Sequence, residues 1–174
     1  ATGEVISAEE LGGAHAQASQ SGNVHFIARD DADAMEIVQK LLSYLPSNNM
    51  EESPSLPTDG LLMIEDESLN KVVPDDSRDS YDMFEILNRV FDKDSIFEVH
   101  AHYAKNMITC FARMNGQVVG VFANQPCEMF GAIDIDASDK AARFIRFCNA
   151  FNIPIISFVD VPGYLPGVEQ EFGG

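Results

Sequence analysis

The sequence MITCFARMNGQVVGVFAN, residues Met107–Asn124, decides the fold of this chain. Two apolar segments flank Asn115-Gly116, a dipeptide that favours a two-residue β-hairpin turn because both of its residues tolerate a positive φ. We therefore expect a strand at 107–114, a second strand at 117–124 and an antiparallel pairing between them.

A helix and a third strand are expected after the hairpin. Ser138 is the predicted N-cap of the helix, whose inward face repeats at three and four residues through Ala141, Phe144, Ile145, Cys148 and Phe151. Its basic residues are expected to form a solvated or subunit-facing flank, namely Lys140, Arg143 and Arg146. The apolar run Ile155–Val159 is typical of a strand covered on both faces. The order hairpin, helix, strand indicates an α/β fold.

The third strand opens directly into a loop rich in glycine and proline, which reads Asp160-Val161-Pro162-Gly163-Tyr164-Leu165-Pro166-Gly167. Backbone N–H groups at the end of such a strand are where α/β proteins place anion and oxyanion sites. A Pro-Gly pair is also a common turn signal, so a purely structural turn is the alternative interpretation of Gly163.

The N-terminal part of the chain predicts two helices and a short strand. Ser7-Ala8-Glu9-Glu10 has the form of a capping box. Val24–Ala28 is expected to form a short strand, and Asp30 is expected to cap an amphipathic helix that Pro46 ends.

Between residues 46 and 78 the periodicity disappears, and proline, serine, asparagine and aspartate dominate. Such a long irregular segment is typical of a boundary or a functional crossover. A helix is expected to begin near Asp79, followed by a strand at Ile96–Ala104.

Composition restricts the function classes. The chain has 174 residues, 45% of them hydrophobic, which is enough for one core. No apolar run approaches the ~18 residues needed to cross a bilayer, and a cytoplasmic location is expected. A net charge of −17 argues against binding a nucleic-acid backbone, which requires clustered Lys and Arg. The cysteines have no metal or redox spacing and are expected to be free, buried thiols.

Two groups of polar residues have competing interpretations. Glu98, His100 and His102 share one face of a predicted strand, which suits either a metal cluster or a solvated surface. A metal site needs three or four converging ligands, and we expect no metal site here. Asp134 and Asp136 suit either an acid–base pair or the acidic loop that commonly precedes a helix.

Many segments, in register along the whole chain, resemble the carboxyltransferase (β) subunit of biotin-dependent acyl-CoA carboxylases, with propionyl-CoA carboxylase and the methylmalonyl-CoA decarboxylase α subunit nearest. They are Glu9–Ala14, Ser21-Gly22, Asp30-Asp31, Pro74 with Tyr81-Asp82, Tyr103–Asn106, Phe111–Gly116, Asn124–Pro126, Ala142–Cys148 and Asp160–Gly163.

The resemblance implies a crotonase-like fold with two partial domains. Residues 1–45 would end the N-terminal carboxyltransferase domain, residues 46–78 would form a crossover linker, and residues 79–174 would begin the C-terminal domain. It also implies transfer of CO2 from carboxybiotin to the α carbon of a short acyl-CoA, propionyl-CoA first. The family's two glycine-rich oxyanion motifs are missing from this sequence, so the isolated chain is expected to be an inactive internal fragment.

The resemblance also suggests site residues and partners. The backbone amides of Gly163 and Tyr164 are the candidate catalytic groups, and no metal is expected. The candidate acyl-CoA-binding residues are Pro74, Arg78, Tyr81 and Asp82, and the candidate residues on the biotin side are Asn124, Gln125, Pro126, Leu165 and Gly167. Asn124 and Gln125 have local backbone capping as their alternative. The expected partners are an acyl-CoA, biotin on a separate carrier, a biotin carboxylase or biotin carboxyl carrier subunit, and further copies of the chain in a homo-oligomer with the active site between subunits.

Two other functions stay open. A carboxyltransferase subunit of a biotin-dependent methylmalonyl- or glutaconyl-CoA decarboxylase would carry the same residues, because the direction of reaction depends on partner subunits. A non-catalytic module that binds coenzyme A or a biotin carrier is the alternative from another class.

Overall fold

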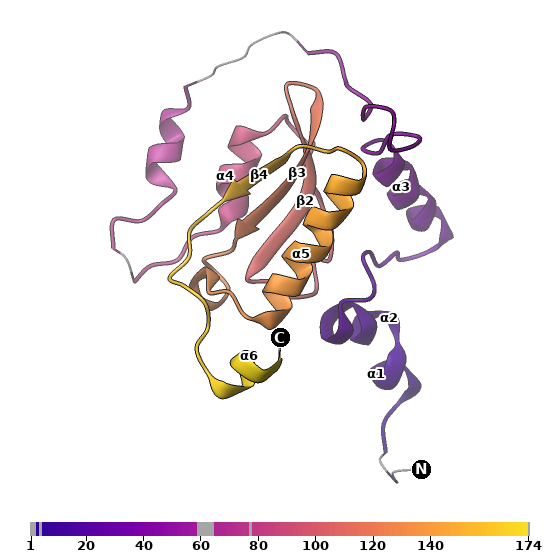
Figure 1. Cartoon of the computed structure of the whole chain (residues 1–174), viewed down its shortest axis with the longest axis vertical. Coiled ribbons are helices and arrows are strands. Elements are labelled where there is room, and N and C mark those ends of the chain that lie inside the picture. The colour runs from indigo at the N-terminus through magenta and orange to yellow at the C-terminus, as the bar shows by residue number, and fades with distance from the viewer. Residues whose placement is uncertain (1–2, 4, 59–64, 77, 174) are drawn as a thin grey trace.

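The computed structural model describes residues 3, 5–58, 65–76 and 78–173. Along the chain its helices and strands are α1 (Ala8–Gly12), α2 (Ala14–Ala16), η1 (Gln17–Ser21), α3 (Asp31–Leu42), η2 (Glu67–Lys71), α4 (Met83–Val90), β1 (Phe97–Glu98), β2 (Met107–Met114), β3 (Gln117–Asn124), η3 (Met129–Gly131), α5 (Ile135–Ala150), β4 (Ile155–Phe158) and α6 (Val168–Gly173). A four-stranded sheet in the order β1-β2-β3-β4 forms the centre (Figure 1).

The predicted hairpin is confirmed in register and extent. β2 and β3 pair antiparallel from Met107↔Asn124 to Met114↔Gln117. Asn115 and Gly116 have φ values of 50° and 77°, the positive values that a type I′ turn requires. The carboxylate of Asp92 accepts both turn N–H groups, at 2.9 Å and 2.7 Å, and thereby holds the turn from outside the hairpin.

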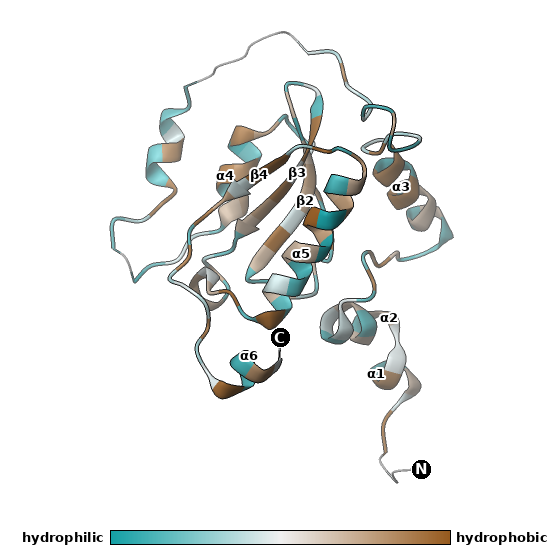
Figure 2. Cartoon of the chain, viewed as in Figure 1, coloured by the Kyte–Doolittle hydropathy of each residue, from teal (hydrophilic) through white to brown (hydrophobic). Residues whose placement is uncertain are grey.

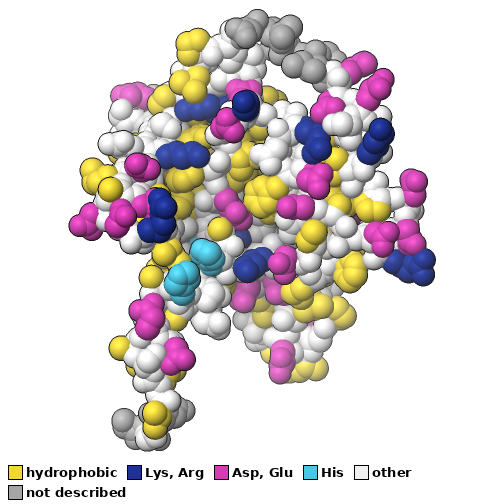
Figure 3. Space-filling model, turned by 180° about the vertical axis from the view of Figure 1, so that it is seen from behind, with side chains coloured by type: hydrophobic (Ala, Val, Ile, Leu, Met, Phe, Trp, Pro, Cys, Tyr) yellow, Lys and Arg dark blue, Asp and Glu magenta, His cyan; other side chains and the backbone are white. Residues whose placement is uncertain are grey.

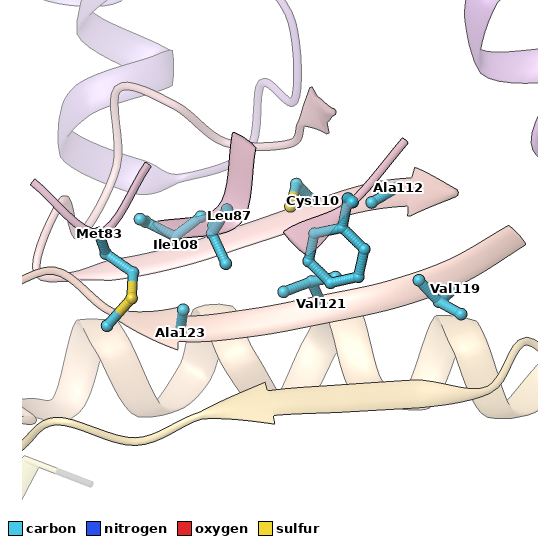
Figure 4. Close-up of a cluster of buried hydrophobic side chains, with 9 residues drawn as sticks. Met83, Leu87, Ile108, Cys110, Ala112, Val119, Val121 and Ala123 are labelled. Atoms are coloured by element: carbon cyan, nitrogen blue, oxygen red, sulfur yellow. The ribbon is translucent and has the colours of Figure 1, made fainter. Parts of the chain in front are cut away.

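Helices cover both faces of the sheet. On one face, Met83 and Leu87 of α4 pack against Ile108, Val121 and Ala123 (Figure 4). On the opposite face, aromatic residues of α5 and of the N-terminal segment form a second cluster around Tyr44, Val99, Phe111, Val118, Phe144, Cys148 and Ile153. Figure 2 shows apolar residues along much of the strands and a mixture of polar and apolar residues on the connecting segments. The α/β prediction is confirmed.

Both long helices on either side of the crossover begin at an aspartate. Asp30 accepts the Asp33 N–H at 2.9 Å and caps α3, as expected, but α3 ends at Leu42 rather than at Pro46. Asp134, and not Ser138, caps α5 by accepting the Ala137 N–H at 2.8 Å. The predicted start was wrong because three residues of the helix precede the serine, whose hydroxyl instead donates back to the Asp134 carbonyl at 2.9 Å.

One predicted strand does not form, and another is much shorter than expected. Val24–Ala28 has no strand in the structure, because the segment offers only a single backbone bond, from the His100 N–H to the His25 carbonyl at 3.1 Å, and no ladder. The predicted strand at 96–104 shrinks to β1, since positive φ values of 58° at His100 and 40° at Ala104 bend the backbone out of the extended region.

Three burial predictions also need correction. β4 lies at the edge of the sheet and is only half covered, with Ile155 37% exposed, because a neighbouring strand pairs with one of its sides only. Lys140, expected in a solvated flank, is 2% exposed. Cys110 and Cys148 are buried as expected, but Cys127 is exposed because it follows β3 in the loop that leaves the sheet.

Arg113 connects three parts of the chain. It is 4% exposed, and its guanidinium donates to the carbonyls of Ser43 (2.6 Å), Pro54 (2.7 Å) and Gly116 (3.0 Å). Its guanidinium carbon also lies 5.0 Å from the ring centre of Tyr44. These bonds join the end of the N-terminal segment, the crossover and the hairpin turn.

Among the described residues, none of the helices is long and apolar enough to span a membrane. Acidic and basic side chains are interspersed on the face shown in Figure 3, so the negative charge of the chain is not gathered in one patch there.

Candidate functional site

The carboxyl ends of β3 and β4 bring two predicted site segments together. The two strands run parallel, so both ends lie at the same edge of the sheet. Asn124 ends β3, and its side-chain oxygen accepts the Asp160 N–H at 3.3 Å, while its NH2 group donates to the Gly131 carbonyl at 3.0 Å. Asn124 is therefore in direct contact with the first residue of the glycine- and proline-rich loop.

Gln125 links this edge to the start of α4. Its side-chain oxygen accepts the Met83 N–H at 3.0 Å, and its NH2 group donates to the Asp82 carboxylate at 2.8 Å. Its own N–H donates to the Asn106 carbonyl at 3.0 Å. Gln125 is 8% exposed, and both of its side-chain polar atoms already have partners within the protein. The next residue, Pro126, is also buried.

Tyr81 and Asp82 lie in the same network. The Tyr81 hydroxyl donates to the Asp160 carboxylate at 2.6 Å. Burial, together with this carboxylate, raises the pKa of Tyr81 above its ordinary value, so the hydroxyl keeps its proton. Asp82 caps α4 by accepting the Phe84 N–H at 2.9 Å. The two residues thus tie the start of α4 to the loop that follows β4.

The other two residues assigned to acyl-CoA by resemblance lie outside this network. Pro74 is half-buried in the segment between η2 and α4. Arg78 forms a two-point ion pair with Asp76, at 2.6 Å and 3.0 Å, and its side chain is 87% exposed. The pair is local and exposed, so it leaves the guanidinium able to exchange partners at little cost.

The loop after β4 exposes backbone donors. Gly163 has a φ of 146°, a backbone angle that residues with a side chain rarely adopt. Its carbonyl accepts the Ile133 N–H at 3.1 Å. The Leu165 N–H donates to the Ile133 carbonyl at 2.8 Å. Within the described residues, no group accepts a hydrogen bond from the N–H of Gly163 or of Tyr164.

The space around these donors is open. A Cβ added at Gly163 or at Gly167 would meet no atom within 4 Å. Tyr164 is 79% exposed and borders a pocket of about 270 Å³ together with Ile133, Leu165 and the acidic residues Asp139 and Glu171. Two adjacent N–H groups in open space can bind one oxygen atom that carries a negative charge.

A larger, apolar pocket of about 380 Å³ lies away from this loop, lined by aromatic residues and by His25, His100 and Arg143. His100 is buried against the His25 ring, 3.9 Å between ring centres, and burial lowers the pKa of His100 to about 4. Within the described residues, no group of three His, Cys, Asp or Glu side chains is arranged to hold a metal ion.

Asp134 and Asp136 have structural partners. Asp134 caps α5 and also accepts from the side chain of Asn106 at 3.2 Å, and Asp136 accepts the Tyr103 hydroxyl at 2.9 Å. The interpretation as a loop that precedes a helix fits these contacts.

Asn106 was not among the predicted site residues, and Asp160 was expected only as the first residue of the glycine- and proline-rich loop, although both hold the site together. The Asp160 carboxylate accepts the Tyr81 hydroxyl, and the Asp160 N–H donates to the Asn124 side-chain oxygen, while the Asn106 carbonyl accepts the Gln125 N–H. Their positions, one directly after an apolar strand and one directly before another, were a usable signal, because polar residues at strand ends meet at one edge of a sheet.

Comparison with known proteins identifies close relatives. The family model for the carboxyl transferase domain matches residues 1–174. Over 99% of this chain, the methylmalonyl-CoA decarboxylase subunit alpha of Veillonella parvula is 54% identical, and the methylmalonyl-CoA carboxyltransferase 12S subunit of Propionibacterium freudenreichii subsp. shermanii is 50% identical. The propionyl-CoA carboxylase beta chain of Saccharopolyspora erythraea is 48% identical.

A solved structure of the transcarboxylase 12S hexamer, with methylmalonyl-coenzyme A and methylmalonic acid bound, superposes with a TM-score of 0.94 at 49% identity and covers 99% of this chain. This similarity bears out the predicted crotonase-like topology. The chain spans about a third of the length of these relatives: 34% of the decarboxylase subunit and 33% of the 12S chain in the solved structure.

Proposed function

The chain belongs to the carboxyl transferase domain family, and we propose that the protein containing it moves CO2 between carboxybiotin and the α carbon of a short acyl-CoA. Propionyl-CoA is the proposed acceptor and methylmalonyl-CoA the product. The relatives named above act on, or bind, these compounds or close analogues, which supports the choice of substrate.

The observation that carries the proposal is the pair of N–H groups at Gly163 and Tyr164. Both lie in an open loop at the carboxyl end of the sheet, and neither has a hydrogen-bond partner within the described residues. A carbonyl or ureido oxygen gains negative charge as the adjacent carbon or nitrogen becomes an enolate-like centre. Preorganised backbone donors stabilise this charge more in the transition state than in the ground state.

Glycine is needed at 163 for two reasons. Its φ of 146° is a backbone conformation that residues with a side chain rarely adopt, and in this conformation its carbonyl accepts the Ile133 N–H. The missing side chain also lets a ligand oxygen approach the backbone closely. These features fit a planar ureido group, and biotin, carried by a separate domain, would supply the CO2. Leu165 and Gly167 would border the same group.

The residues around the loop would hold it in place rather than react. Tyr81 and Asn124 bind Asp160 from two sides, and Gln125 binds Asp82 at the start of α4. No side-chain nucleophile takes part in this scheme. Pro74 and Arg78 are the proposed contacts for the coenzyme A portion, with Arg78 exchanging Asp76 for a phosphate.

We further propose that residues 1–45 end one carboxyltransferase domain, that residues 46–78 cross over, and that residues 79–174 begin the second. In support, all four strands of the sheet come from residues 97–158, and the described part of the crossover holds a single short helix, η2. The proposed partners are a biotin carboxylase or carrier subunit and further copies of the chain, with the active site between subunits. A cytoplasmic location stays a prediction, testable by cell fractionation.

The test is carboxyl transfer by the full-length protein. Purified protein, supplied with a carboxylated biotin carrier and propionyl-CoA, should form methylmalonyl-CoA, measured by mass spectrometry. The 174-residue chain alone should show no turnover. Tight binding of both ligands without turnover by the full-length protein would instead indicate the non-catalytic module.

A decarboxylase subunit is the second candidate, favoured by the 54% identity with the methylmalonyl-CoA decarboxylase subunit of Veillonella parvula. The two functions differ in direction. Decarboxylation of methylmalonyl-CoA without ATP, in the presence of free biotin or its carrier, would support the decarboxylase, whereas ATP-dependent carboxylation with a biotin carboxylase would support the carboxylase.

A further inference from the structure

Lys140 carries a charge that is taken almost completely out of water. It lies in α5 and is 2% exposed. An ammonium group loses several kcal/mol of hydration on burial, which a close carboxylate can offset. Among the described residues, no carboxylate lies within 4.0 Å of Lys140, so it forms no direct ion pair. A charge retained under these conditions needs another explanation.

The ammonium binds two consecutive backbone carbonyls. Its Nζ donates to the Tyr103 carbonyl at 2.7 Å and to the Ala104 carbonyl at 3.3 Å. Ala104 has a φ of 40°, a left-handed conformation that an alanine adopts at a cost. The Ala104 carbonyl also accepts the Met107 N–H at 3.0 Å, at the first residue of β2. Lys140 therefore holds a strained turn directly against the start of a central strand.

This turn leads to the proposed site through Asn106 and through Met107, which pairs with Asn124. The Asn106 carbonyl accepts the Gln125 N–H at 3.0 Å, and its side chain donates to the Ala132 carbonyl at 2.8 Å. Gln125 is bound to Asp82, and the preceding residue, Asn124, is bound to Asp160 at the start of the Gly163 loop. Every step of this path is a hydrogen bond between described groups or a direct chain neighbour.

The electrostatics agree with a fixed ammonium. Burial lowers the pKa of Lys140 to about 8, and the nearby Glu98 carboxylate opposes this shift. Burial in turn raises the pKa of Glu98. Near neutral pH the lysine keeps its proton, and carbonyl oxygens are its direct partners.

We propose that Lys140 is a positioning residue for the Gly163 loop, acting through the Tyr103–Asn106 turn on Asn124 and Gln125. The proposal rests on the proposed function only for its effect on catalysis, because its structural part concerns the turn alone.

Two readouts on the full-length protein test it. The first is hydrogen exchange of a peptide that contains Gln125, and the second is the kinetics of carboxyl transfer. In Lys140→Met the Gln125 amide should exchange about ten-fold faster than in the wild type, because opening of the turn breaks its bond to Asn106. The kcat should fall about 10- to 100-fold, while the KM for propionyl-CoA changes about three-fold or less, since donors displaced by a fraction of an ångström lose transition-state contacts first.

Two variants separate positioning from a general loss of structure. Lys140→Arg keeps a cationic donor and should recover most of the kcat and the slow exchange at Gln125. Arg146→Met removes a charge from an exposed position of the same helix and should change neither. If Lys140→Met does not fold, Lys140→Gln, which keeps a neutral donor, replaces it and should give intermediate values of both readouts.

Unchanged exchange at Gln125 in a folded Lys140→Met protein would overturn the proposal, and so would equal losses of kcat in Lys140→Met and Lys140→Arg. A wild-type protein without carboxyl transfer would instead refute the proposed function, and the exchange experiment would still decide the role of Lys140.

Discussion

Replacing Gly163 by alanine should remove much of the proposed activity with little loss of global stability. The added methyl group meets no atom within 4 Å, so steric crowding is not the cause. The cause is the backbone, because a φ of 146° is strongly unfavourable for alanine. The loop should relax to a negative φ, which turns the peptide planes around residue 163 and redirects the N–H groups of Gly163 and Tyr164.

The magnitudes follow from two separate terms. Holding alanine in the native conformation would cost about 1–3 kcal/mol, and relaxation of an exposed loop avoids part of it, so we expect about 1 kcal/mol of lost stability. Removing a preorganised backbone donor from an oxyanion site costs about 10²–10³ in kcat. Catalysis should therefore suffer far more than folding.

The assay is carboxyl transfer to propionyl-CoA by the full-length protein, with thermal unfolding measured on the same samples. Gly12→Ala is the matched control, since Gly12 has no positive φ and its nearest atom, in the Gln17 side chain, is 4.0 Å from an added Cβ. The control should keep the wild-type kcat. The loss of an oxyanion donor would lower kcat far more than about three-fold. A Gly163→Ala protein that kept more than about a third of the wild-type kcat would therefore refute the role of these amides.

Three further outcomes are expected. Arg113→Met should lower the free energy of unfolding by about 3 kcal/mol, because three carbonyls lose a buried cationic donor, and Arg113→Lys should lose less; urea unfolding measures both. The free energy of unfolding should fall as the pH drops from about 6.5 towards 4. The reason is that burial lowers the pKa of His100 in the folded state, so that in this range the unfolded state binds a proton at His100 and the folded state does not. Above about pH 6.5 the stabilisation from neutral His100 is fully present. The slope of the urea midpoint against pH should therefore flatten in His100→Gln, and an unchanged slope would show that other groups titrate. Tyr81→Phe should lower kcat about three- to ten-fold and stability by at most about 1 kcal/mol, since it frees Asp160 from one of its two partners at an exposed site; an unchanged kcat would mean that Asn124 alone holds the loop.

Much of the fold follows from local sequence. The Asn115-Gly116 turn requires two positive φ values that few other dipeptides tolerate, so the hairpin and its register could be predicted. The apolar spacing of α5 predicted its inward face, with Ala141, Phe144 and Cys148 buried. Its start was missed because Asp134 and Ser138 are both good capping residues, and the choice depends on which one accepts a free N–H group.

The site was only partly predictable. The resemblance led to Asn124 and to the Gly163 loop, which the structure brings together through Asp160. Its assignment of Tyr81 to a substrate stays a prediction, and the structure adds a hydrogen bond from the Tyr81 hydroxyl to Asp160. A sequence does not show that such a bond forms, because it joins residues 79 positions apart.

The amino-acid sequence by itself determined the elements whose signals lie within a few residues: the hairpin turn, the helix periodicity and the family of the chain. Tertiary structure alone decided that β4 is an edge strand, that Lys140 is buried beneath the Tyr103 turn, and that two N–H groups after β4 have no acceptor among the described residues. The physical reason is that burial and hydrogen-bond partnership depend on which distant segments pack together, and side-chain type alone does not carry that information.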